Sequence, residues 1–350
     1  TAKHVLLVES GALAELLILA VDQTLQFDRQ QDLQPESLVF EQFVVEQRPN
    51  ERPHQVGGAV DQVGLVDAID HDDGRVDAVF EHGGHSPTGR VRYIDADIRQ
   101  YAAWGFRYLK VDCHPSDDEI AELRAAIDAH APDLILSLSA NYNAAEIGRV
   151  GHWANTWRTS GDLIDTWFNL RGKIRRLGAW GALGRPHHWD DPDMLVVGHV
   201  GPGWNAPCQR TRLDPEEQYL HMSLWAMAAA PLLIGADLTR LDAFTFKLLA
   251  NPEVIAVDQD PLGLPGRRVL RDEAAATEVW HRRLADGSDA VCLVNLGEQP
   301  QRINAPLLRL GIGGGRTARD CWRQRELGRC GSELAAEVAA HGAELFRLHR

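Results

Sequence analysis

The sequence predicts an α/β fold built on a parallel sheet, followed by a small antiparallel β domain. From Tyr101 to about Leu264, short apolar runs such as "FRYLKVD" and "DLILSLS" alternate with helix-like segments such as "DDEIAELRAAIDAH". Strands that alternate with helices of about 10 to 15 residues are typical of parallel sheets with crossover helices. After "LGLPGRR" the chain changes to short strands and turns. A doubly wound sheet and a closed barrel both satisfy the first pattern.

The apolar runs of the first region predict buried strands because they are apolar on both faces. In chain order, the predicted elements are a strand at 106–112, a helix at 117–130, a strand at 133–139, a helical stretch, a strand at 154–160, a helix at 216–230, an apolar run at 231–237 and a helix at 242–251. In the helix at 216–230, Leu220, Leu224 and Met227 repeat at helical spacing, which indicates a face packed in the core.

The C-terminal region shows a hairpin signal. The runs "TEVWHRR" and "AVCLVNL" flank "LADGSD", in which Asp286 and Gly287 form a dipeptide that favours a tight two-residue turn. The segments "GIGGGR" and "GAELFRLHR" continue the pattern of turns and short strands. We therefore expect an antiparallel β domain from residue 268 to residue 350.

Composition limits the classes of partner. The chain has 350 residues and a net charge of -14, which disfavours nucleic acid and anionic membranes because phosphate contacts need clustered Lys and Arg. The longest apolar stretch, "ALAELLILAV", is interrupted by Glu15 and is shorter than the roughly 20 residues that span a bilayer. No signal peptide is evident. We expect a soluble protein, cytoplasmic or secreted, of unknown oligomeric state.

Two pairs of charged residues stand near the ends of predicted strands. Lys110 and Asp112 are two apart in "FRYLKVD" and therefore point to the same face. Arg158 ends the strand in "WRTSGDLIDTW", and Asp162 follows in a Ser-Gly loop. A structural ion pair and a helix N-cap are the alternative explanations. Active sites of parallel α/β folds form at the carboxyl ends of strands, which favours a catalytic role.

A third polar stretch, "HHWDDPDMLVVG", carries three aspartates beside Trp189. Adjacent histidines point to opposite faces of a strand, and the spacing matches no metal site. The five cysteines also lack metal-ligand spacing. We therefore expect neither a metal nor a cofactor.

Two carboxylates on neighbouring strands, with a lysine, an arginine and an aromatic side chain around them, suit glycoside hydrolysis. A retaining enzyme needs one carboxylate as nucleophile and a second as acid/base, roughly 5 Å away. Cationic neighbours keep the nucleophile ionised, and tryptophan offers a flat apolar face to a sugar ring.

Five segments, taken in order, resemble the signatures of the family 27 glycoside hydrolases, the α-galactosidase (melibiase) and α-N-acetylgalactosaminidase group. These segments are "YLKVDC", "WRTSGDLIDTW", "WDDPDMLVVG", "SLWAMAAAPLLIGADL" and "EVIAVDQDPLG". The resemblance implies a (β/α)8 barrel followed by an antiparallel β-sandwich domain. It gives three expected parts: an atypical segment at 1–92 in place of the first barrel strands, the catalytic barrel region at 93–267, and the β domain at 268–350.

The resemblance also implies roles for individual residues in hydrolysis of terminal α-D-galactosides with retention. Asp112 would be the nucleophile and Asp162 the acid/base. Lys110, Arg158 and Asp193 would contact the sugar or position the carboxylates. Trp189 and Met194 would line the pocket.

Two departures from the family pattern leave alternatives open. Where the family has a Glu-Trp pair, this chain has Ser139, Ala140 and Asn141, whose smaller volume suits a 2-acetamido group and hence an α-N-acetylgalactosaminidase. All ten tryptophans lie from Trp104 onward, so the tryptophan-containing motifs of the first three barrel strands are missing. A catalytically dead barrel remnant is therefore a further alternative.

Overall fold

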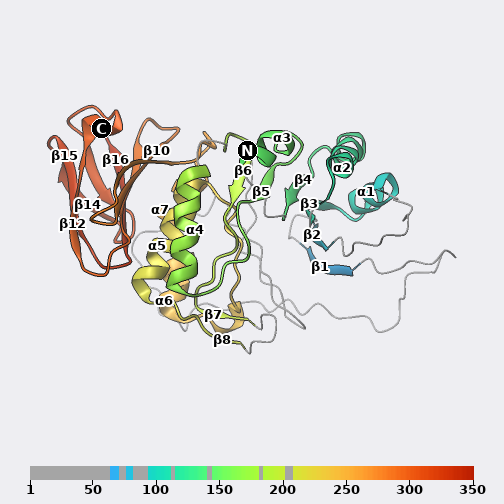
Figure 1. The fold of residues 1–350 in the computed structure, drawn as a ribbon, viewed down its shortest axis with the longest axis horizontal. Helices are drawn as coiled ribbons and strands as arrows, with labels where there is room; N and C mark the ends of the chain where they lie inside the picture. The colour runs from blue at the N-terminus through green and yellow to red at the C-terminus, as the bar shows by residue number, and fades with distance from the viewer. Residues whose placement is uncertain are drawn as a thin grey trace, which may run out of the picture.

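The computed structural model describes residues 64–70, 76–81, 94–111, 115–139, 144–180, 184–201 and 208–350. Figure 1 shows two sheets at opposite ends of the molecule, with helices α4 to α7 between them.

The first sheet has six strands in the order β1-β2-β3-β4-β5-β6. Their bounds are β1 Gly64–Asp70, β2 Val76–Glu81, β3 Phe106–Val111, β4 Ile135–Leu138, β5 Thr156–Arg158 and β6 Trp189–Asp191. The pairing of β1 with β2 is antiparallel, and each pairing from β2 to β6 is parallel. The strands predicted at 106–112, 133–139 and 154–160 are thus confirmed as β3, β4 and β5, in parallel order.

Helices connect the parallel strands: α1 Ile94–Ala103, α2 Asp117–His130, α3 Ala144–Val150 and α4 Trp167–Trp180. Helix α2 begins where expected because Ser116 and Glu119 form a capping box. Right-handed crossovers between strands in sequential order place all the helices on one face, whereas a doubly wound sheet reverses its order at a switch point. The topology is therefore of the barrel type.

The chain continues the barrel pattern after β6. Leu195 forms a parallel bridge with Ile234, so the apolar run predicted at 231–237 pairs with the segment that follows β6. Between them lie the short strands β7 His199–Val200 and β8 Gln209–Arg210 and helix α5 Pro215–Ala228. The 3-10 helix η2 Leu238–Arg240 and helices α6 Ala243–Leu249 and α7 Pro252–Asp258 follow. Within the described residues the sheet does not close.

The C-terminal domain is an antiparallel β-sandwich, as predicted. One sheet has the order β14-β13-β16-β11-β10-β9, and β12 pairs with β15 in a second. The bounds are β9 Arg267–Asp272, β10 Thr277–Arg283, β11 Asp289–Asn295, β12 Gln301–Pro306, η3 Leu307–Leu310, β13 Thr317–Asp320, β14 Arg325–Arg329, β15 Glu333–Val338 and β16 Ala343–His349. The predicted hairpin joins β10 to β11, but its turn is longer than the expected two residues: the Leu284 N–H donates to the Ser288 carbonyl at 3.0 Å and the Gly287 N–H to the Leu284 carbonyl at 3.1 Å. Gly287 takes a left-handed φ of 80° in this turn.

Helix α5 joins the two halves of the molecule. It packs against α4, α6 and α7 and also against β10, β11 and β16. Leu220 and Leu224 of α5 belong to the same apolar cluster as Cys292 of β11 and Leu345 of β16. The predicted core face of this helix is thus confirmed, and the cluster extends across both domains.

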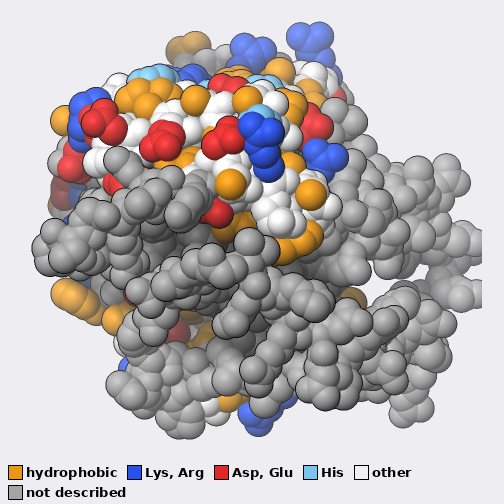
Figure 2. Space-filling view, turned by 90° about the vertical axis from the view of Figure 1, so that its right-hand side faces the viewer, with side chains coloured by type: hydrophobic (Ala, Val, Ile, Leu, Met, Phe, Trp, Pro, Cys, Tyr) orange, Lys and Arg blue, Asp and Glu red, His pale blue; other side chains and the backbone are white. Residues whose placement is uncertain are grey.

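The described surface is mixed in charge. On the face drawn in Figure 2, acidic and basic side chains are interspersed among apolar ones. None of the described helices is both long enough and apolar enough to cross a bilayer.

Candidate active site

The carboxyl ends of β3, β5 and β6 meet at one edge of the sheet. Arg158, the last residue of β5, is paired in register with Asp191, the last residue of β6. Strand β3 ends at Val111. Asp112, the next residue in sequence, lies outside the described residues. Arg158 therefore lies at the edge where parallel α/β folds form active sites, as does the end of β3.

Arg158 is the centre of the described site. Its side chain is 4% exposed, and its Nη2 donates to Asp193 Oδ2 at 2.7 Å and to Asp162 Oδ1 at 3.2 Å. The same nitrogen lies 3.3 Å from the carbonyl oxygen of Ser160. Its Nε has no hydrogen-bond partner among the described residues. One buried guanidinium thus holds two of the predicted site carboxylates together.

Asp193 is a buried carboxylate held on several sides. Besides Arg158, it accepts hydrogen bonds from the backbone nitrogens of Leu163 at 2.5 Å and Met194 at 2.9 Å. Its own φ is 89°, a conformation that its backbone contact to Asp191 Oδ1 at 2.8 Å helps to fix. Burial raises the pKa of Asp193 to about 6, and the charge of Arg158 opposes that rise. This carboxylate therefore depends on nearby cations to stay ionised.

Asp162 differs because its side chain is 87% exposed. Helix α4 begins only at Trp167, so Asp162 is not its N-cap, and that alternative explanation is excluded. Its carboxylate instead accepts a hydrogen bond from Arg158. A carboxyl group in this position can exchange protons with solvent.

Two further aspartates lie on β6. Asp190 is 2% exposed and accepts a hydrogen bond from Trp157 Nε1 at 2.8 Å, and burial raises its pKa to about 7. Asp191 is 1% exposed, and its Oδ2 has no partner among the described residues. An unsatisfied buried carboxylate oxygen is costly unless a ligand completes it. Asp191 was not predicted as a site residue, although it lies two positions before Asp193 and at the end of a strand.

The structure brings Met194 to the site edge and places Trp189 elsewhere. The Met194 side chain lies over Gly235, where a Cβ would stand 2.7 Å from its sulfur, so only glycine leaves room for it. Trp189 begins β6, at the other end of the strand from Asp191, and its Nε1 donates to the carbonyl of Gly263 at 2.9 Å. Trp189 is therefore not grouped with Arg158 in the described site.

Lys110 lies on β3, where it is paired in register with Val79 of β2 and Ser137 of β4. Ser139 donates its backbone N–H to the Val111 carbonyl at 2.8 Å, which places it beside the end of β3. Ala140 and Asn141, the other two residues of the family departure, lie outside the described residues. Ser139 thus lies at the carboxyl end of β3.

One described group has the ligand types for a metal ion: Asp214, Glu217 and His341. Asp214 and Glu217 already form the capping box of α5. His341 lies 3.0 Å from Glu217 Oε1 through Nδ1 and 3.0 Å from Glu298 Oε2 through Nε2. These side chains therefore satisfy one another without a metal.

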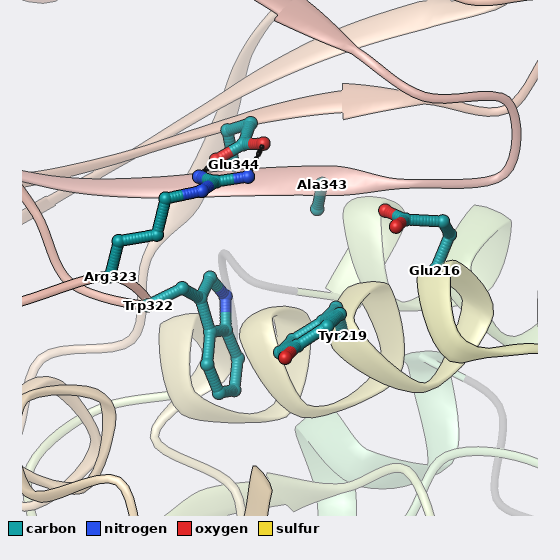
Figure 3. A pocket seen from close by; sticks show the side chains of 6 residues that line it. All are labelled: Glu216, Tyr219, Trp322, Arg323, Ala343 and Glu344. Atoms are coloured by element: carbon teal, nitrogen blue, oxygen red, sulfur yellow. Dashed lines mark hydrogen bonds and ion pairs between the residues drawn. The ribbon is translucent and has the colours of Figure 1, made fainter. Parts of the chain in front are cut away.

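A concave region away from Arg158 lies between α5 and the C-terminal sheet. Figure 3 shows Tyr219 and Glu216 on α5 facing the Arg323–Glu344 ion pair, with Trp322 beside them. The cavity has a volume of about 80 Å³, below the roughly 300 Å³ at which ligand pockets begin. It is too small for a hexose and its aglycone.

Comparison with known proteins settles the family. The family model described as alpha galactosidase A matches residues 27–260, and the model of the alpha galactosidase C-terminal β-sandwich domain matches residues 274–348. The chain belongs to glycoside hydrolase family 27. The (β/α)8 barrel followed by a β-sandwich is therefore the fold of the molecule.

Three relatives illustrate the family 27 membership. An alpha-galactosidase of Oryza sativa subsp. japonica is 32% identical over 78% of this chain and 64% of its own length. An alpha-N-acetylgalactosaminidase of Mus musculus is 30% identical over 77% and 65%. A family 27 β-L-arabinopyranosidase from Geobacillus stearothermophilus is 31% identical, with a TM-score of 0.69 over 74% of this chain and 61% of that structure. The chain thus spans less than two thirds of each.

Proposed function

We propose that this protein is a retaining glycosidase that cleaves terminal α-D-galactosyl residues by double displacement. In this proposal Asp112 is the nucleophile and Asp162 the acid/base. Lys110, Arg158 and Asp193 bind sugar hydroxyls or hold the carboxylates in place, and Met194 supplies an apolar wall; Trp189, at the other end of β6, is left out of the proposed pocket. No metal or cofactor takes part.

The reaction would proceed in two steps. Asp112 attacks the anomeric carbon and forms a glycosyl-enzyme while Asp162 donates its proton to the departing oxygen. Asp162 then takes a proton from water, which attacks the same carbon and releases the sugar with its original configuration. The exposure of Asp162 suits a group that must meet both leaving group and water.

The observation that carries the proposal is the Arg158 guanidinium shared by Asp162 and Asp193 at the carboxyl edge of the sheet. Support also comes from two buried atoms that have no hydrogen-bond partner among the described residues, Arg158 Nε and Asp191 Oδ2. A sugar hydroxyl group can both accept a hydrogen bond from a guanidinium and donate one to a carboxylate. A sugar presents several such hydroxyls. Membership of glycoside hydrolase family 27 indicates the class of reaction, which is glycoside hydrolysis.

The test is hydrolysis of p-nitrophenyl α-D-galactopyranoside and of methyl α-D-galactopyranoside by the purified protein. Asp112→Asn is expected to abolish both activities. Asp162→Asn is expected to slow hydrolysis of the methyl glycoside about 10²- to 10⁴-fold. It should slow the first step on the p-nitrophenyl glycoside much less, because nitrophenolate leaves without a proton. Asp133→Asn removes an exposed carboxylate next to β4 and serves as the control. Undiminished turnover by Asp112→Asn would overturn the assignment.

Two other substrates discriminate the competing activities. The corresponding α-N-acetylgalactosaminide tests the replacement of the family's Glu-Trp pair by Ser139, Ala140 and Asn141, and the β-L-arabinopyranoside tests the activity named for the bacterial relative. Preferential turnover of either would replace galactose as the substrate. Folded protein that turns over none of the three would favour the dead remnant.

The proposal also covers the binding partner and the domain limits. We infer a small-molecule galactoside as the partner, with no nucleic acid or membrane, in a soluble protein. The limits 1–92, 93–267 and 268–350 remain the proposed division. The start of β9 at Arg267 supports its last boundary.

A further inference from the structure

The chain leaves β6 through a buried turn, Asp191-Pro192-Asp193. Asp193 has a φ of 89°, a left-handed conformation that is unfavourable for a residue with a side chain. Such a conformation persists only where the surrounding structure holds it. The contacts of the Asp193 backbone therefore show what holds this turn.

Asp191 and Trp225 fix the Asp193 backbone from its two sides. Asp191 Oδ1 accepts the N–H of Asp193 at 2.8 Å, so a side chain binds the backbone two residues further on, as in an Asx turn. The Asp193 carbonyl accepts a hydrogen bond from Trp225 Nε1 of α5 at 2.6 Å. Both polar groups of the Asp193 backbone are thus satisfied in the left-handed conformation.

Asp191 is itself fixed by the sheet. It is the last residue of β6 and is paired in register with Arg158 of β5. Its carbonyl accepts the N–H of Thr159 at 3.0 Å, which extends this pairing by one residue. The side chain that holds the turn therefore starts from a rigid part of the barrel.

The conformation of Asp193 directs its carboxylate. Asp193 Oδ2 accepts from the N–H of Leu163 at 2.5 Å and from Arg158 Nη2 at 2.7 Å. Leu163 directly follows Asp162, so this carboxylate also holds the loop that carries the proposed acid/base. A change of φ to the usual negative range would swing the Cα–Cβ bond of Asp193, and its carboxylate, away from these donors.

We propose that Asp191 is a positioning residue of the active site, whose Oδ1 holds Asp193 in the conformation that binds Arg158 and the Asp162 loop. The proposal rests on the function proposed above in so far as it concerns turnover. It gives the two oxygens of Asp191 separate parts, because Oδ2 is the atom left without a partner among the described residues. Loss of Oδ1 should therefore have an effect that loss of Oδ2 does not.

The experiment compares Asp191→Asn, which keeps an acceptor at the Oδ1 position, with Asp191→Ala, which removes it. Asp190→Asn changes the neighbouring buried carboxylate, which binds Trp157 instead of the turn, and is the control. One measurement is the hydrogen exchange of the Leu163 amide, followed by NMR with ¹⁵N-leucine and assigned with Leu163→Ile. The other is kcat/KM for p-nitrophenyl α-D-galactopyranoside.

In Asp191→Ala the Leu163 amide is expected to exchange about tenfold faster or more, because the carboxylate that binds it is released. Asp191→Asn and Asp190→Asn should keep the exchange rate of the wild type. The expected kcat/KM of Asp191→Ala is about tenfold below that of Asp191→Asn, since misplaced site groups slow turnover. Any loss that the two Asp191 variants share belongs to Oδ2.

Unchanged Leu163 exchange in Asp191→Ala would overturn the proposal, as would equal, measurable kcat/KM in Asp191→Ala and Asp191→Asn. Circular dichroism checks that each variant folds. If Asp191→Ala does not fold, Asp191→Leu takes its place with the same expected results, because an apolar side chain of similar volume suits a buried site.

The exchange measurement separates this inference from the proposed function, because it needs no substrate. If the wild type turns over no galactoside but the Leu163 amide still exchanges faster in Asp191→Ala and not in Asp191→Asn, the positioning stands and the proposed function fails.

Discussion

At the scale of single residues, Arg158 decides the geometry of the site. A guanidinium is planar and carries several N–H donors in a fixed fork, so it can serve two acceptors at once. Here Asp162 and Asp193 share one nitrogen while Arg158 is itself almost fully buried. A lysine in its place could not hold both carboxylates in the same orientation.

The effect of one buried carboxylate on the stability of the protein can be tested at Asp190. The pKa of Asp190 is raised to about 7 by burial, well above that of the unfolded chain. The folded state therefore binds the proton more tightly, and stability is lost as pH rises from about 4 to 7. Asp190→Asn keeps the acceptor for Trp157 without the charge. We expect it to stabilise the protein by an amount that grows by up to about 3 kcal/mol between pH 5 and pH 8.

Urea unfolding at the two pH values measures this difference. Asp133→Asn, which changes an exposed carboxylate paired with Arg107, serves as the control. A gain from Asp190→Asn that is the same at pH 5 and pH 8 would show that Asp190 is not protonated by burial.

The sequence allowed some of these residues to be predicted and concealed others. Arg158, Asp162 and Asp193 were predicted from strand ends and family motifs, and the structure groups them. Asp191 was not assigned a role because its signal, a buried carboxylate oxygen without a partner among the described residues, depends on tertiary packing and shows only in the structure.

At the scale of elements, α5 links the barrel to the β domain. Its start is fixed by local chemistry: Asp214 accepts from the N–H of Glu217 at 2.9 Å, and Glu217 accepts from the N–H of Asp214 at 3.0 Å. Pro215 stands in the first turn, where its missing N–H costs nothing. His341 of the C-terminal domain then binds Glu217.

Asp214→Ala should lower the free energy of unfolding by about 1 kcal/mol, because it leaves a helix N–H without its side-chain acceptor. Asp214→Asn retains an acceptor of the right length and should cost a few tenths of that. Thermal or urea unfolding of the two variants makes the comparison. Equal losses in both would show that the charge of Asp214, and not its cap, is what matters.

The elements themselves were largely predictable, but their order in space was not. The apolar runs gave β3, β4 and β5, and Asp286 with Gly287 gave the hairpin of β10 and β11. Periodicity carries no information on which strands pair, so it could not separate a barrel from a doubly wound sheet; the resemblance to family 27 indicated the barrel, and the sequential pairing of β2 to β6 agrees with it. The antiparallel pairing of β1 with β2 had no counterpart in the sequence pattern.

At the scale of the whole molecule, one apolar cluster spans the two domains. Arg282 of β10 is 1% exposed and donates to the carbonyls of Ala226 at 2.7 Å and Asp258 at 3.1 Å. Trp322 donates to Ser223 Oγ at 2.9 Å. These contacts join the β domain to α5 and α7 (Figure 1). The β domain therefore supports the helices behind the candidate site.

The proposed double displacement by Asp112 and Asp162 can be tested by the anomeric form in which the sugar is first released. Proton NMR can follow the first minutes of p-nitrophenyl α-D-galactopyranoside hydrolysis, before mutarotation mixes the anomers. The account predicts that α-galactopyranose appears first with the wild type and not at all with Asp112→Asn. First appearance of the β anomer would mean a single displacement, and galactose release by Asp112→Asn would mean another nucleophile; either result would contradict the account.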